Sequence, residues 1–209
     1  MPIRWKKAFM ERSGSFNLIL LGDPASGKGT QAAHLIRKFG FYDFDMGREV
    51  RKPTARSHYD YKKTTAIGKL TPTAVVRGIL ARVVPSVPKT KGILFNGHPK
   101  MINEAKLVAR LLEKTNRRDP LVLYLAIPMR ETIQRARGRL RDDDSLRAIR
   151  NRRRYYETQI ARVCAFFKKR YPMERINGVG SEAEVWKRIE KAIDRHMQRH
   201  GNHQKRKTN

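Results

Sequence analysis

The residues with the clearest chemical potential form one glycine-rich segment, Gly22-Asp23-Pro24-Ala25-Ser26-Gly27-Lys28-Gly29-Thr30. It follows the apolar run from Phe16 to Leu21 and precedes apolar residues at helical spacing. Glycines let the backbone curl so that successive N–H groups point at an anion, and the helix dipole adds to the attraction. Lys28 would reach the outer phosphates of a ligand, and Thr30 would hold a magnesium ion or a phosphate oxygen. The segment therefore predicts a phosphate-binding loop between a strand and a helix.

The spacing departs from the strict phosphate-loop pattern in one place. That pattern has Ser or Thr directly after the lysine, whereas Gly29 intervenes here before Thr30. A glycine-rich turn without a ligand is the alternative interpretation, and the strand and helix predicted on either side argue against it.

The elements that must position this loop are predicted from the apolar pattern. Further strand-like runs are Phe41 to Phe44, Gly92 to Phe95 and Leu121 to Ile127. Apolar stripes at helical spacing run from Ile149 to Phe167 and from Val185 to Met197. Strands that alternate with helices predict right-handed crossovers and a parallel sheet covered on both faces. The fold class is therefore α/β.

Composition limits the class of protein further. A length of 209 residues indicates one domain, and a net charge of +28 attracts nucleotides, nucleic acid or acidic lipid. The single cysteine, Cys164, excludes an internal disulfide framework and a zinc site built from cysteines. The apolar runs are too short to cross a bilayer. We expect a cytoplasmic protein with no membrane partner.

Both ends of the chain are basic. We interpret residues 1–15 as a solvated N-terminal extension, with an Arg-rich organelle leader as the alternative. Residues 201–209 are predicted to be a short disordered tail.

Six segments in matching order resemble the motifs of adenylate kinases and their nucleoside monophosphate kinase relatives, over residues 16 to 197. They are GDPASGKGTQA, MGREVR at 46–51, GKLTP at 68–72, NGHPK at 96–100, QRARGRLRDDDSLRAIRNRRRYYETQ at 134–159, and INGVGSEAEV from 176. The resemblance implies a three-layer phosphate-loop kinase fold with a central parallel five-stranded sheet, spanning residues 16–200. It also implies an acceptor-binding flap at 46–76 and a short lid at 137–146. Short-lid forms carry no structural zinc, and we expect a monomer.

The same resemblance implies two nucleotide sites and a catalytic group. The ATP site would contain Gly22, Ala25, Ser26, Gly27, Lys28, Gly29, Thr30, Arg135, Arg139 and Gly180. The AMP site would contain Met46, Arg51, Lys69, Leu70, Thr71, Gly97, His98, Pro99, Lys100, Glu104, Arg141 and Arg152. The catalytic residues would be Lys28, Arg139, Arg141 and Arg152, because the Lys28 ammonium and the permanent guanidinium charges of the arginines neutralise the migrating phosphoryl group. Mg²⁺ would lie near Thr30 and Asn96, held through water.

Two departures from the family pattern concern the metal and the phosphates. Asn96 stands where the family has an aspartate that orients the waters around magnesium, so we expect weaker metal positioning. Lys100 replaces an arginine and keeps the charge without the bidentate fork.

Three other departures concern the acceptor. Met46 replaces a threonine near the base, and His98 replaces an aromatic residue, either as a pH-sensitive group or as a packing substitute. Glu104 stands where a glutamine commonly reads the base. A carboxylate only accepts hydrogen bonds, which suits guanine. Alternatively, Glu104 stabilises the start of its helix and backbone groups around residues 68–71 read the base.

These observations leave three hypotheses. The first is reversible phosphoryl transfer from Mg-ATP to AMP, giving two ADP. The second keeps the fold and uses GMP, CMP or UMP as acceptor, motivated by Glu104 and Met46. The third is a catalytically weak nucleotide- or RNA-binding relative, motivated by Asn96, Lys100 and the charge of +28, with nucleic acid as a secondary partner in the first two cases.

Overall fold

The computed structural model describes residues 16–52, 71–117, 119–137 and 146–205. In chain order the elements are β1 (Leu18–Gly22), α2 (Lys28–Phe39), β2 (Tyr42–Phe44), α3 (Met46–Arg51), α5 (Thr73–Ser86), β3 (Ile93–Asn96), α6 (Ile102–Lys114), β4 (Leu121–Ala126), α7 (Met129–Arg137), α8 (Leu146–Lys168), β5 (Met173–Asn177) and α9 (Glu182–Lys205). Each of the predicted apolar runs overlaps a strand. Within the described ranges, no helix is both long and apolar enough to span a membrane.

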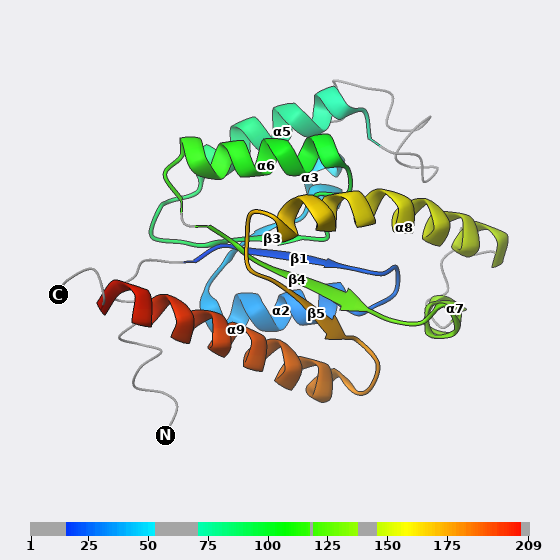
Figure 1. Ribbon diagram of the computed structural model, residues 1–209. Helices are drawn as coiled ribbons and strands as arrows, with labels where there is room; N and C mark the ends of the chain where they lie inside the picture. Colours follow the sequence, from blue (N-terminus) through cyan, green and yellow to red (C-terminus); the bar gives the residue numbers. More distant parts are fainter. Residues whose placement is uncertain (1–15, 53–70, 118, 138–145, 206–209) are drawn as a thin grey trace.

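The strands form one parallel sheet in the order β2-β3-β1-β4-β5. β1 pairs with β3 on one side, where Leu20 is opposite Asn96, and with β4 on the other, where Gly22 is opposite Leu125. Figure 1 shows α3, α5, α6 and α8 on one face of the sheet and α2 and α9 on the other. This arrangement confirms the three-layer fold and the five-stranded parallel sheet.

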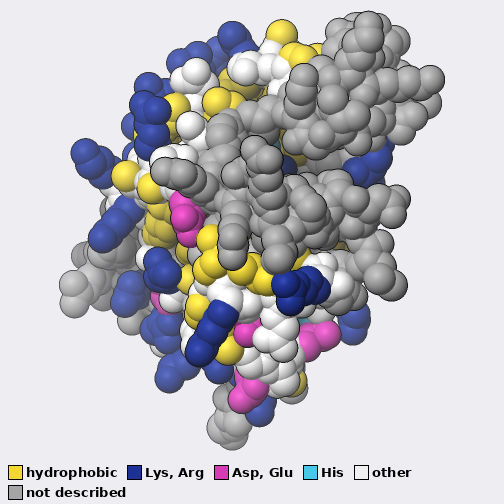
Figure 2. Space-filling view, turned by 90° about the vertical axis from the view of Figure 1, so that its right-hand side faces the viewer, with side chains coloured by type: hydrophobic (Ala, Val, Ile, Leu, Met, Phe, Trp, Pro, Cys, Tyr) yellow, Lys and Arg dark blue, Asp and Glu magenta, His cyan; other side chains and the backbone are white. Residues whose placement is uncertain are grey.

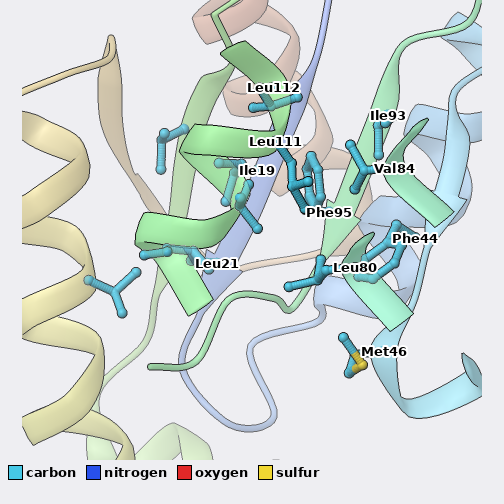
Figure 3. Close-up of a cluster of buried hydrophobic side chains, with 14 of the residues drawn as sticks. Ile19, Leu21, Phe44, Met46, Leu80, Val84, Ile93, Phe95, Leu111 and Leu112 are labelled. Carbon is cyan, nitrogen blue, oxygen red and sulfur yellow. The ribbon is translucent and has the colours of Figure 1, made fainter. Parts of the chain in front are cut away.

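Alternate side chains of the strands supply two cores. Ile19 and Leu21 of β1 enter the core beneath α3, α5, α6 and α8, together with Phe44 and Phe95 (Figure 3). The neighbouring residues Leu18 and Leu20 enter the core against α2 and α9. Burial of each such side chain stabilises the fold by about 1.5–3 kcal/mol, so β1 is firmly held where the phosphate loop begins.

Glycines in the left-handed conformation bound α2. Gly27 precedes the helix with φ 87°, and Gly40 ends it with φ 67° while its N–H donates to the Ile36 carbonyl. Gly40 therefore ends the helix that follows the phosphate loop. α9 continues through Gly201 to Lys205, which corrects the predicted start of a disordered tail at residue 201. A single glycine inside a helix costs only about 1 kcal/mol, so it does not end α9.

Candidate functional site

The predicted site lies at the carboxyl ends of the strands. β1 leads through the phosphate loop to α2 on one face, and β3 leads to α6 on the other face (Figure 1). Ligands of open α/β sheets bind where connections diverge in this way. The segments that follow β1 and β3 lie close together, as shown by the distance of 3.6 Å between a Cβ built on Gly97 and Cε of Lys28. The structure thus brings Gly97 and the loop lysine together.

The first turn of the phosphate loop is anchored on β4. The buried Asp23 carboxylate accepts hydrogen bonds from the Tyr124 hydroxyl at 2.5 Å and from the Ile127 N–H at 2.8 Å. Gly22 lies against the same strand, since an added Cβ would be 2.6 Å from the Leu125 carbonyl oxygen. Burial, reinforced by Asp23, raises the pKa of Tyr124, so its hydroxyl keeps the proton that it donates. These contacts hold the loop in place before any phosphate binds.

Lys28 places its charge over the loop. Its Nζ donates to the carbonyl oxygens of Gly22 at 2.6 Å and Asp23 at 2.7 Å. The Tyr156 ring centroid is 5.8 Å from this Nζ, and the Tyr156 hydroxyl accepts from the Gly22 N–H at 3.3 Å. Carbonyl partners leave the ammonium charge in place, so Lys28 is ready to exchange them for phosphate oxygens.

The outer part of the loop has no close neighbour among the described residues at Gly27 and Gly29. Ala25 and Gly27 have positive φ values of 62° and 87°, which turn successive N–H groups inward in the manner of an anion-binding nest. A Cβ built on Gly27 or Gly29 would meet no atom within 4 Å in the described residues, and Thr30 is exposed on the first turn of α2. Figure 2 looks onto this end of the molecule, where Lys and Arg side chains lie around the rim and some carboxylates lie among them. The arrangement suits a polyphosphate.

The loop between β5 and α9 lies beside the phosphate loop. A Cβ on Gly178 would be 3.0 Å from Cγ2 of Ile127 and 3.5 Å from the Ser26 carbonyl oxygen. Arg135 on α7 donates through Nη2 to the Gly178 carbonyl at 3.1 Å, and its Nε pairs with Glu131 at 2.7 Å. The structure therefore joins Arg135 and the loop containing Gly180 to one side of the phosphate loop, next to the expected position of the donor nucleotide.

The edge of the sheet where magnesium is expected, at Asn96 on β3 and Asp43 on β2, has little uncompensated negative charge among the described residues. Asn96 donates from Nδ2 to Oδ1 of Asp43 at 3.4 Å. Oδ2 of Asp43 accepts from Arg48 at 2.9 Å, which neutralises this carboxylate. Within the described ranges, no group of three or more His, Cys, Asp or Glu could hold a metal. These residues fit a magnesium ion that is held mainly by nucleotide phosphates and touches the protein through water.

The predicted acceptor residues lie around α3 and the start of α6. Met46 is 9% exposed and packs in the core with Leu80 and Phe44 (Figure 3). Arg51 is exposed at the end of α3, and Lys100 is exposed after β3. Thr71 precedes α5. The phosphate-contacting candidates are thus exposed, whereas the Met46 side chain is buried.

His98 and Glu104 are both buried and form part of the helix start rather than an open surface. Oε2 of Glu104 accepts the backbone N–H groups of Lys100 at 2.8 Å and Met101 at 3.2 Å, and lies 3.6 Å from Nδ1 of His98. Burial raises the pKa of Glu104. Burial, with a smaller contribution from Lys100, lowers the pKa of His98 to about 3. This geometry favours helix capping for Glu104 and packing for a neutral His98.

Several predicted residues lie outside the described part of the chain. They are Lys69 and Leu70 in the expected flap, and Arg139 and Arg141 in the expected lid. Arg152 belongs to α8, in the stretch for which only the backbone is described. Their roles stay predictions.

Four residues near the site were not predicted as functional: Asp23, Asp43, Tyr124 and Tyr156. Asp23 stands inside the loop motif, but its partner Tyr124 is read from sequence only as an apolar strand residue. Tyr156 lies within the apolar stripe predicted from Ile149 to Phe167, and it contacts the loop through its ring and hydroxyl. Asp43 follows the pattern of a short strand, and only strand pairing places it beside Asn96.

The fold and the loop together define a phosphate-loop α/β protein built to bind nucleotides. A family model described as adenylate kinase matches residues 20–171. An adenylate kinase of Xanthomonas oryzae pv. oryzae is 31% identical over 185 residues, covering 85% of this chain and 99% of the relative. Adenylate kinases of Azobacteroides pseudotrichonymphae (31% over 192 residues, 85% and 97% covered) and Porphyromonas gingivalis (28% over 187 residues, 86% and 96% covered) are also similar. The chain belongs to the adenylate kinase family, and it is an enzyme of the nucleotide kinase class.

Proposed function

We propose that the protein catalyses reversible phosphoryl transfer from Mg-ATP to AMP, giving two ADP. The observation that carries this proposal is the anchored phosphate loop, with Lys28 over its centre and Gly97 of the expected acceptor site beside that lysine. The relatives with similar length and sequence are named adenylate kinases, which supports AMP as the acceptor.

The donor nucleotide would be bound by the loop and its neighbours. Backbone N–H groups from Ala25 to Thr30, which include the start of α2, would surround the β- and γ-phosphates. Lys28 would leave the carbonyls of Gly22 and Asp23 and contact the phosphate oxygens. Arg135 and the Gly178–Gly180 loop would border the donor base and ribose.

The transfer needs two polyanions in line and a neutralised migrating group. The bond between the γ-phosphorus and the bridging oxygen of ATP breaks while a bond to an AMP phosphate oxygen forms. Arg51 and Lys100 would hold the AMP phosphate, and Arg139, Arg141 and Arg152 would neutralise the transferred group. Closure of the flap (46–76) and the lid (137–146) would exclude water, so that ATP is not simply hydrolysed.

Magnesium would neutralise charge on the β- and γ-phosphates. Thr30 and Asn96 would hold it through water, and the neighbouring Asp43 carboxylate would contribute once Arg48 releases it. Because the amide of Asn96 carries no charge, most of the binding would come from the nucleotide. No zinc is part of the proposal, since Cys164 is the single cysteine. We also propose that the protein acts as a monomer in the cytoplasm.

Guanine competes with adenine as the candidate for the acceptor base. Glu104 was the reason to consider GMP, because a carboxylate accepts from two adjacent guanine donors. Its Oε2 already accepts two backbone N–H groups at the start of α6, which supports helix capping and therefore AMP.

An acceptor panel tests the proposal. The protein is incubated with Mg-ATP and AMP, GMP, CMP or UMP, and the nucleoside diphosphate formed is measured. We expect the highest kcat/KM with AMP. A preference for GMP that Glu104→Gln abolishes would contradict helix capping as the only role of Glu104. ATP binding without turnover on any acceptor would favour the weak, nucleic-acid-binding relative.

A further inference from the structure

The end of the sheet away from the phosphate loop carries a second group of basic side chains. Because the strands are parallel, the loops after α5, α6 and α8 meet at the amino ends of β3, β4 and β5 (Figure 1). Arg117 Nη1 donates to the Lys91 carbonyl at 3.0 Å, and the Val122 N–H donates to the Pro172 carbonyl at 2.9 Å. These bonds join the three loops into one surface. We call it the basic edge; its basic residues are Lys89, Lys91, Lys114, Arg117, Lys168, Lys169 and Arg170.

Much of this charge is not neutralised. The acidic neighbours are Glu113, in the last turn of α6, and Asp119, in the loop that follows it. In the described part of the chain, no carboxylate forms an ion pair with Lys91, Lys114, Lys168 or Lys169. Some basic residues of the opposite layer are paired, since Lys38 pairs with Glu190 and Arg195 with Glu174. The four lysines of the basic edge named above keep their positive charge without such a partner among the described residues.

Aromatic rings lie among these charges. The Arg170 guanidinium is 5.3 Å from the centroid of the Phe166 ring, and the Tyr171 ring is 5.8 Å from that of Phe167. Phe166 and Tyr171 are both partly exposed. Aromatic rings and arginine planes next to lysines are the groups on which unpaired bases stack while the lysines contact phosphates.

Two simpler explanations account for only part of the basic edge. Basic residues at helix C-termini complement the helix dipole, which accounts for Lys114 and Lys168 but not for Lys91 or for the partly exposed rings of Phe166 and Tyr171. A membrane surface would need apolar side chains to insert, and Met129 is the one large hydrophobic residue recorded as exposed among the described residues. Met129 begins α7 at the opposite end of the sheet.

We propose that the basic edge binds single-stranded nucleic acid, with its lysines on the phosphate backbone and the Phe166–Arg170–Tyr171 group on the bases. Binding there leaves the nucleotide site accessible, because that site lies at the other end of the strands. The proposal does not depend on which nucleotide is the acceptor.

The test measures binding of a labelled U-rich RNA 20-mer and a labelled T-rich DNA 20-mer to the full chain, by fluorescence anisotropy at several salt concentrations. We expect the triple variant Lys168→Gln, Lys169→Gln, Arg170→Gln to bind at least roughly tenfold more weakly. The slope of log Kd against log salt concentration should also be smaller by about 2, because each lost phosphate contact removes about 0.7 from the slope. The control removes the same charge from α9, with Lys187→Gln, Lys191→Gln and Arg199→Gln, and should retain most of the affinity. Phe166→Leu should weaken binding roughly fivefold or more with the salt slope unchanged.

Retained kinase activity in each variant shows that the chain is folded. Equal loss of affinity in the two triple variants would overturn the proposal, because only the total charge would then matter. Displacement of the oligonucleotide by saturating Mg-ATP would place it in the phosphate loop and overturn the proposal too. Binding to vesicles containing phosphatidylserine, without binding to either oligonucleotide, would replace nucleic acid by an anionic membrane.

Discussion

A fall in pH should destabilise the protein through His98, and replacing His98 by Phe should remove this effect. The residue is 1% exposed, its Nε2 has no hydrogen-bond partner in the described residues, and burial lowers the pKa of His98 to about 3. In the unfolded chain the imidazole pKa returns to 6.5. Between these two pKa values the unfolded chain binds a proton that the folded chain does not, so the free energy of unfolding falls as the pH falls.

The size of the effect follows from the two pKa values. At pH 5 the unfolded imidazole is almost fully protonated, whereas the folded one stays neutral. The free energy of unfolding should therefore fall by about 2 kcal/mol between pH 7.5 and pH 5, which lowers Tm by roughly 4–8 °C. Glu104 acts in the opposite direction, because burial raises its pKa and protonation relieves a buried charge. Both proteins contain Glu104, so the difference between them reports His98 together with any change in the Glu104 pKa that follows loss of the 3.6 Å contact with Nδ1.

Phe is the matched replacement, since it keeps a ring beside Phe44, whose centroid is 5.7 Å from that of His98. Urea unfolding of the wild type and His98→Phe is followed by circular dichroism at pH 7.5, 6 and 5. The variant should be the more stable at pH 7.5, because a buried polar atom without a partner is removed. Its advantage should grow by about 2 kcal/mol at pH 5. Parallel pH dependences for the two proteins would refute a buried, neutral His98.

Three further changes test the site. Asn96→Asp should lower the magnesium concentration that gives the half-maximal rate. Titration calorimetry should also show stronger binding of Mg-ATP relative to free ATP. If neither magnesium dependence changes, Asn96 does not contribute to magnesium binding. Tyr124→Phe leaves one oxygen of the buried Asp23 without its hydroxyl partner, and should lower the free energy of unfolding by about 1–3 kcal/mol and weaken ATP binding. Gly178→Ala places a Cβ 3.0 Å from Ile127 Cγ2 and should weaken ATP more than AMP. Equal weakening of the two nucleotides would argue against a donor-side position for this loop.

The phosphate loop and most of the sheet could be predicted because their signals are local. A buried strand, a glycine-rich turn and an amphipathic helix follow one another from Leu18 to Phe39. β5 (Met173–Asn177) could not be located from the apolar pattern, because it contains polar residues whose partners come from other elements of the fold. Glu174 pairs with Arg195 on α9, and the Arg175 guanidinium lies 5.7 Å from the Tyr124 ring centroid.

The supporting contacts of the site depend on strand pairing and could not be read locally. Asp23 and Tyr124 meet only because β1 and β4 are neighbours, and Asn96 meets Asp43 only because β2 lies beside β3. Glu104 is a different case, since its type and position allowed both base reading and helix capping. The hydrogen bonds from the Lys100 and Met101 N–H groups support helix capping.

The most direct test of the central claim compares two lysines of the same helix. Lys28 lies over the phosphate loop, whereas Lys38 pairs with Glu190 at the far end of α2. The measurement is the rate of ADP formation from Mg-ATP and AMP for Lys28→Ala, Lys38→Ala and the wild type. Our account predicts that kcat falls by roughly a hundredfold or more in Lys28→Ala and stays near the wild-type value in Lys38→Ala. Wild-type turnover in Lys28→Ala would contradict phosphoryl transfer at this loop.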